Sequence, residues 1–114
     1  MTKSTHEMYT FFMDMEKICS RIFQNSFAQA MDLCCVIAYI TIKVKKFPFN
    51  KEEFHVYFRK LVRNTPISNV DIEVIETEEV PDDIIILDSL ESFSEGDTPP
   101  QVFPFHESIN KIQL

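Results

Sequence analysis

Apolar residues recur at three- and four-residue steps in the first part of the chain, which is the spacing of one face of an α-helix. A first stripe follows the capping-box spacing of Ser4 and Glu7, and a second follows the same spacing at Ser26 and Gln29. The first stripe consists of Met8, Phe11, Phe12, Met15, Ile18, Cys19, Ile22 and Phe23, and the second of Ala30, Leu33, Val36, Ile37, Ile40 and Val44. Each stripe predicts a helix.

A third helix has the clearest start signal. Asn50 is a good N-cap residue, Glu53 follows three positions later, and Phe49 and Phe54 occupy the positions of a hydrophobic staple. The apolar face that follows ends at Asn64, shortly before a proline. The pattern therefore predicts three helices over residues 4–64.

The second of these helices has an alternative. Isoleucine, valine and threonine are concentrated between residues 36 and 44. Branching at Cβ restricts these side chains in a helix and suits them to a strand. Residues 40–46 could therefore form a strand instead.

Charge divides the chain at Asn64. Ten basic and six acidic residues lie up to that point, whereas one basic and twelve acidic residues follow it. All three cysteines and all three tyrosines lie in the first part, and five of the six prolines in the second. We therefore predict a mainly α protein, with a helical interaction domain over residues 1–64 and an acidic, largely extended or disordered tail over 65–114.

The helical part is small for an independent domain. A single core of fewer than about 70 residues rarely supplies more than about 3–5 kcal/mol. Phe11 and Phe12 are adjacent, so they cannot both face the same side of a helix. We expect a protein partner to bury part of the apolar surface of the helices.

The tail contains an aliphatic cluster among carboxylates. Ile84, Ile85, Ile86 and Leu87 follow two aspartates and precede Asp88. Such a segment is suited to join the sheet of another protein as a strand, with the carboxylates directing it to a basic surface. An intramolecular alternative is that residues 84–87 or 70–75 pair with a strand formed by residues 36–44.

This cluster resembles the SUMO-interacting motif, in which three or four aliphatic residues lie next to acidic or phosphorylatable ones. A second segment, with Ile72, Val74 and Ile75 followed by glutamates, resembles the version with one free position. The resemblance implies that these segments bind SUMO or a SUMO-modified protein by adding a strand to its sheet. Ser92 and Ser94 each precede an acidic residue by three positions, and so resemble casein kinase II phosphorylation sites.

Other chemistry has little support in the sequence. A single glycine, Gly96, excludes glycine-rich nucleotide loops. A zinc site would have to combine Cys19, Cys34, Cys35 and His55, which lack the usual ligand spacing. The longest apolar run, residues 33–42, is about half of a membrane span. We expect no enzyme activity, no cofactor, no metal and no membrane segment.

The favoured function is a non-enzymatic nuclear adaptor, with a cytoplasmic location as the alternative. Its helices would bind a protein partner and its tail would bind SUMO. One competing function is a structural subunit of a multiprotein complex without SUMO binding. Another is a basic helical nucleic-acid binder screened by the acidic tail, which would use Lys43, Lys45, Lys46, Arg59, Lys60 and Arg63.

Overall fold

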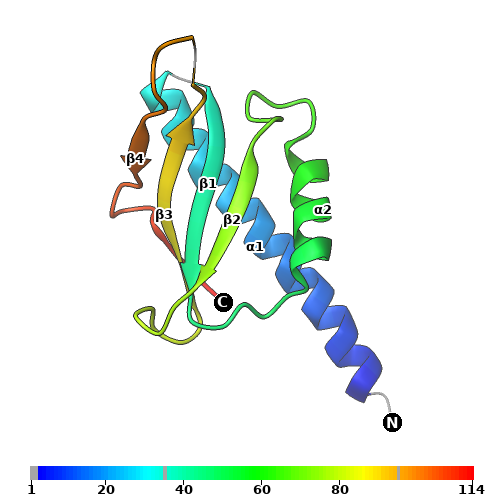
Figure 1. Cartoon of the computed structure of the whole chain (residues 1–114). Coiled ribbons are helices and arrows are strands. Elements are labelled where there is room, and N and C mark those ends of the chain that lie inside the picture. The colour runs from blue at the N-terminus through cyan, green and yellow to red at the C-terminus, as the bar shows by residue number, and fades with distance from the viewer. Residues whose placement is uncertain (1–2, 35, 95) are drawn as a thin grey trace.

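The protein is a mixed sheet covered on one face by two helices (Figure 1). The computed structural model describes residues 3–34, 36–94 and 96–114, and side chains from residue 15 onward. The elements in chain order are α1 (Lys3–Leu33), β1 (Ile37–Val44), α2 (Lys51–Val62), β2 (Asp71–Glu76), β3 (Ile84–Ser92), β4 (Val102–Pro104) and β5 (Lys111–Gln113). The prediction of a mainly α, three-helix unit is therefore wrong.

The first helix continues through the predicted break. Ser26 does not begin a new helix but lies buried inside α1. The apolar face continues past it from Ile22 to Ala30, so the helix has a continuous stripe to pack against the sheet. Met8, Phe11 and Phe12 of the predicted apolar stripe lie outside the residues whose side chains are described.

The second predicted helix is divided between two elements, because its first part, up to Leu33, belongs to α1 and residues 37–44 form a strand. Residues 37–44 form β1, with Ile40, Ile42 and Val44 buried and the side chains between them more exposed. This alternation is that of a strand with one covered face. The alternative that placed a strand at residues 40–46 was close to the observed bounds.

The third predicted helix is confirmed. Asn50 precedes α2, and its side-chain oxygen accepts a hydrogen bond from the Glu53 backbone N–H at 3.0 Å. Phe54 and Phe58 on the next turns are buried. Asn64 has a φ of 64°, a left-handed conformation common just after a helix end.

Strands from both sides of residue 64 form one sheet, in the order β2-β1-β3-β4 with β5 also paired to β3. β1 runs parallel to β2 and antiparallel to β3. The prediction of an extended or disordered tail is wrong, because residues 65–114 supply β2, β3, β4 and β5 of this sheet. The aliphatic side chains of this region have a second layer to pack against, namely the two helices.

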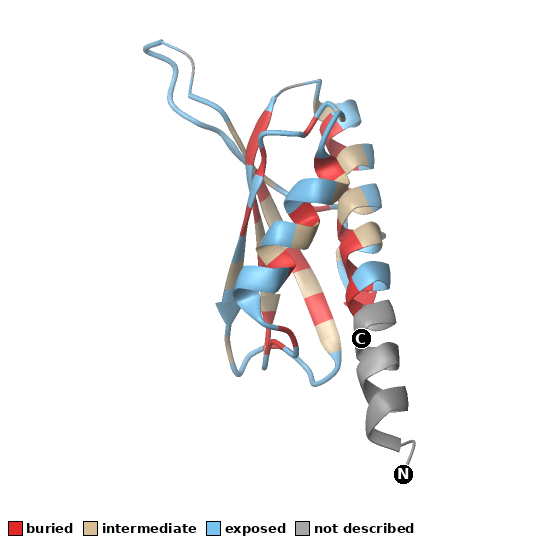
Figure 2. Cartoon of the chain, turned by 90° about the vertical axis from the view of Figure 1, so that its right-hand side faces the viewer, coloured by how far each residue is buried: buried red, intermediate tan, exposed pale blue. Residues whose placement is uncertain are grey.

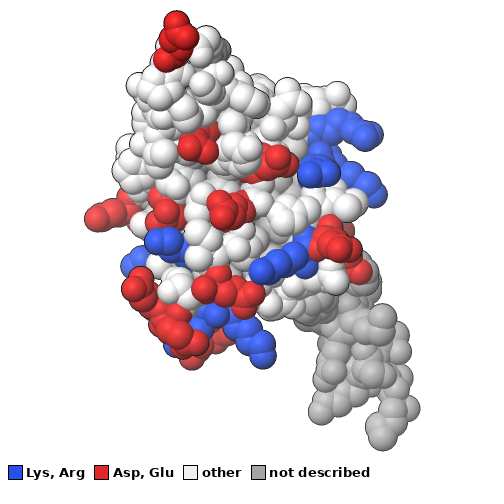
Figure 3. All heavy atoms as spheres, viewed as in Figure 1, with Lys and Arg blue, Asp and Glu red and all other residues white. Residues whose placement is uncertain are grey.

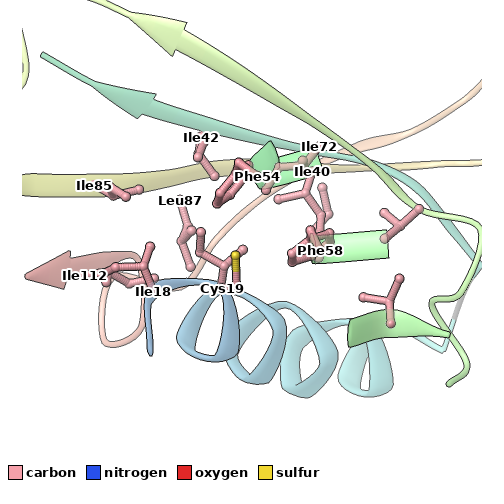
Figure 4. Packing of buried hydrophobic residues seen from close by; sticks show 14 of the residues in the cluster. Ile18, Cys19, Ile40, Ile42, Phe54, Phe58, Ile72, Ile85, Leu87 and Ile112 are labelled. Atoms are coloured by element: carbon pink, nitrogen blue, oxygen red, sulfur yellow. The ribbon is translucent and has the colours of Figure 1, made fainter. Parts of the chain in front are cut away.

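The core lies between the sheet and the helices, as the burial pattern in Figure 2 shows. In Figure 4, Phe54 and Phe58 of α2 meet Ile40 and Ile42 of the sheet. The core also includes Ile18, Cys19, Ile72, Ile85, Leu87 and Ile112. Every one of these side chains is nearly or fully buried, so the helices and strands depend on one another for their packing.

Two amides of α1 hold the C-terminal part of the chain. The buried Gln29 side chain donates to the Pro104 carbonyl at 2.7 Å and accepts from the His106 N–H at 2.9 Å. Asn25 donates to the Ile109 carbonyl at 2.9 Å. These contacts satisfy main-chain groups of Pro104 at the end of β4 and of His106 and Ile109 between β4 and β5, and so fix the segment that borders β3.

Candidate functional site

Two segments resemble the SUMO-interacting motif, and they occupy very different places in the sheet. The first, from Ile84 to Asp88, lies in β3, between β1 on one side and β4 and β5 on the other. Ile85 is 0% exposed and Leu87 is 1% exposed. The main-chain groups of this segment are paired on both sides, including Leu87 N–H to the Asn110 carbonyl at 2.7 Å. A foreign strand could pair with Ile84 to Asp88 only if β3 left the sheet or if the segment that carries β5 left β3.

The second segment, from Ile72 to Ile75, lies in β2 at the edge of the sheet (Figure 1). Its inner side pairs with β1, and the pairing continues to Thr77, whose N–H donates to the Val44 carbonyl at 2.9 Å. Main-chain groups of successive strand residues point to opposite sides. The groups of Ile72, Val74 and Glu76 therefore point away from β1, where a strand could be added.

A histidine from α2 marks the outer side of this edge. The His55 ring Nε2 lies 2.7 Å from the Ile72 carbonyl oxygen. Because a carbonyl can only accept a hydrogen bond, this geometry requires a proton on Nε2. The N–H and C=O of Val74 also point outward, and no residue in the described part of the chain forms a hydrogen bond with them. The edge is thus covered at Ile72 and open from Val74 onward.

The side chains around this edge combine apolar and acidic groups. Ile72 is buried, Val74 is half-buried and Ile75 is 36% exposed. Val56 on α2 is 52% exposed, and with His55 and Ile72 it lines a shallow hollow of about 360 Å³ beside the edge. The exposed acidic residues along and after the strand are Asp71, Glu73, Glu76, Glu78 and Glu79.

The six candidate nucleic-acid residues do not form one surface. Lys43 pairs with Asp88 at 3.4 Å, Lys45 with Asp82 at 3.7 Å and Arg59 with Asp71 at 3.5 Å. The other three, Lys46, Lys60 and Arg63, are exposed. Figure 3 shows basic atoms over the C-terminal end of α2 and, separately, among acidic atoms at the lower end of the sheet.

The two candidate phosphorylation sites lie at the end of β3 and in the loop after it. Ser92 is half-buried, and its hydroxyl oxygen accepts a hydrogen bond from the Gln101 N–H at 3.0 Å. Ser94 is exposed, and its hydroxyl donates to the Thr98 carbonyl at 2.9 Å. Ser94 is therefore the more accessible of the two hydroxyls. Phosphorylation of either serine stays a prediction.

The residues considered for zinc are not brought together where they are described. Cys19 lies in the core, where burial raises the pKa of its thiol to about 12, whereas Cys34 is exposed at the end of α1. His55 is engaged with Ile72, and Cys35 lies outside the described residues. Among the described side chains, no group of three or more His, Cys, Asp or Glu residues has a metal-binding arrangement. Within the described residues, neither helix is long and apolar enough to span a membrane.

Comparison of the chain with family models, with curated proteins and with solved structures finds no match. The arguments about function therefore rest on the geometry of this molecule. Sequence reasoning missed the contact between His55 and Ile72, which are 17 residues apart. No local pattern signals it, because only the packing of α2 against the edge of the sheet brings the two together.

Proposed function

We propose that the protein is a non-enzymatic adaptor that binds SUMO, or a SUMO-modified protein, by strand addition at the outer edge of β2. The observation that carries the proposal is that the outer edge of β2 is open from Val74 onward, within the segment Ile72–Ile75 that has the second motif resemblance. A strand added there would complete the hydrogen bonds of Val74 and Glu76.

The side chains near the outer edge of β2 favour a protein partner that has basic residues around its binding surface. Ile75 and Val56 offer apolar surface that a partner strand and its side chains would cover. Five acidic residues lie on β2 or in the turn after it, and Asp71 and Glu76 each have a basic partner, Arg59 and Lys51. Glu73, Glu78 and Glu79 have no ion-pair partner among the described residues, so they would attract cations of the partner.

The position of Ile84–Leu87 inside the sheet changes the prediction that this segment binds SUMO. Because Ile85 and Leu87 contribute to the core, binding through Ile84–Leu87 would cost the packing of β3. We therefore assign the proposed contact to the Ile72–Ile75 segment. A nuclear location follows from a SUMO partner and stays a prediction.

The test is a titration of the ¹⁵N-labelled full chain with SUMO, combined with a proline at the edge. In Val74→Pro the lost N–H is one that points away from β1, so the β1–β2 pairing is retained while strand addition is blocked. The matched control Val74→Ala removes the same side-chain packing but keeps the N–H. We expect amide shifts centred on residues 71–77 and on His55 and Val56, with at least tenfold weaker binding by Val74→Pro than by Val74→Ala.

Three results would contradict the proposal. One is the absence of any SUMO-induced shift, and another is equal binding by the proline and alanine variants. The third is a set of shifts centred on residues 84–88 together with loss of the β3 amide protection, which would assign the contact to an opened β3. The shift map of the unmodified chain decides the site even if Val74→Pro does not fold.

A further inference from the structure

A cleft of about 670 Å³ lies between α1 and the end of the sheet where β1 finishes. It is separate from the β2 edge and contains none of the residues assigned to SUMO. Its walls come from α1, the end of β1 with the following loop, the turn before β3 and the C-terminal residues.

Four basic side chains border this cleft from two directions. Lys17 and Arg21 are four residues apart on α1 and so lie on the same face of the helix. Lys45 and Lys46 come from the end of β1. Lys45 pairs with Asp82 at 3.7 Å, whereas Lys17, Arg21 and Lys46 have no ion-pair partner among the described side chains.

The inner part of the cleft is apolar. Ile18, Val44 and Phe49 are all buried members of the core whose side chains also line the cavity. Asp83 also lines the cleft and forms no ion pair with the described residues. Among the side chains that the structure describes, three basic ones without an ion pair are thus opposed by one acidic side chain without an ion pair. The lining thus combines an apolar wall with an excess of positive charge.

We propose that this cleft binds a small amphiphilic anion. Its carboxylate or phosphate group would lie among Lys17, Arg21 and Lys46, and its apolar chain would lie against Ile18, Val44 and Phe49. The volume falls within the range of about 300–1,000 Å³ that is usual for small-molecule sites.

The charge of the whole chain favours a small anion over a polyanion. The formal net charge is −7, so a long nucleic acid would be repelled by most of the surface. A small ligand instead senses mainly the local cations, because charges beyond a Debye length of about 8 Å are screened at physiological salt.

The test uses decanoate, decyl phosphate and uncharged decanol as probes with the ¹⁵N-labelled full chain, the two anions below their micelle concentrations and decanol below its solubility limit. We expect both anions to shift amides of residues 17–21 and 44–49, and decanol to bind at least tenfold more weakly. The double variant Lys17→Gln, Arg21→Gln should weaken anion binding at least tenfold. The matched variant Lys60→Gln, Arg63→Gln removes the same charge from exposed positions at the C-terminal end of α2 and just after it, and should change the affinity less than twofold.

The comparison of decanoate with decyl phosphate identifies the preferred head group. Equal binding of decanol would overturn the proposal, because the cations would then have no role. Equal weakening by the two double variants would also overturn it, since only net charge would matter. The absence of shifts at residues 17–21 and 44–49 at millimolar probe would show that no such site exists.

Discussion

At the scale of single residues, Cys19 shows how the apolar core changes the pKa of an ionisable side chain. It lies on the buried face of α1 with 0% of its surface exposed. Burial raises the pKa of its thiol from an ordinary value of 9.0 to about 12, because the charged thiolate is poorly solvated there. The half-buried Tyr57 of α2 also has a raised pKa, first through burial and then through the charges of Glu16 and Cys19. Cys19 is therefore a core residue with a protonated, unreactive thiol at neutral pH.

The raised pKa of Cys19 predicts a loss of stability at high pH. In the unfolded chain the thiol ionises near pH 9, whereas in the folded chain it stays protonated until about pH 12. The contribution to folding is thus fully present below pH 9 and is lost as the pH rises from 9 toward 12, because the unfolded chain has then released a proton that the folded chain still holds. Urea unfolding at several pH values should show this loss in the native chain and a smaller one in Cys19→Ala. If the free energy of unfolding changed equally with pH in the native chain and in Cys19→Ala, the raised pKa of the Cys19 thiol would be contradicted.

At the scale of elements, β3 has the central place in the fold. It is bordered by β1, β4 and β5, and its inward residues Ile85, Leu87 and Leu90 are all buried. β2, by contrast, is paired on one side only, and its Ile75 is partly exposed. Two segments of similar composition therefore have different roles: one belongs to the core and the other forms an edge.

This difference predicts unequal effects of truncating the two strands. Leu87→Ala should lower the free energy of unfolding by about 2–5 kcal/mol, as is usual for a cavity in a packed core. Ile75→Ala should cost less than about 1 kcal/mol, because its side chain lies partly in solvent. Chemical denaturation of both variants measures the difference. Equal small effects would mean that β3 is not packed as described.

At the scale of the whole molecule, opposite charges on the two parts of the chain meet across the fold. Each of the four ion pairs among the described side chains joins a cation before residue 64 to an acid after it. The pairs are partly or largely exposed, so each is worth at most about 1 kcal/mol. The shared sheet and core, rather than these ion pairs, hold the two parts together.

The shared core predicts that the first part cannot fold by itself. A fragment of residues 1–64 contains α1, β1 and α2 but neither neighbour of β1 in the sheet. It would leave both edges of β1 unpaired and much of the core exposed to water. We expect circular dichroism of this fragment to show no cooperative unfolding transition, whereas the full chain should show one. A cooperative transition in the fragment would establish an independent helical domain.

Local sequence information determined α2 and the amphipathic face of α1. The Asn50 cap acts within one turn and is satisfied by the Glu53 N–H, so α2 follows from local sequence, whereas the same spacing at Ser26 and Gln29 lies inside α1 and begins no helix. Tertiary structure decided the state of residues 37–44 and of the acidic part. A short aliphatic run suits either a buried helix or a strand, and its choice depends on partners distant in the chain. β1 pairs with strands that begin at residues 71 and 84, and the helices supply the second layer that makes these segments part of one core.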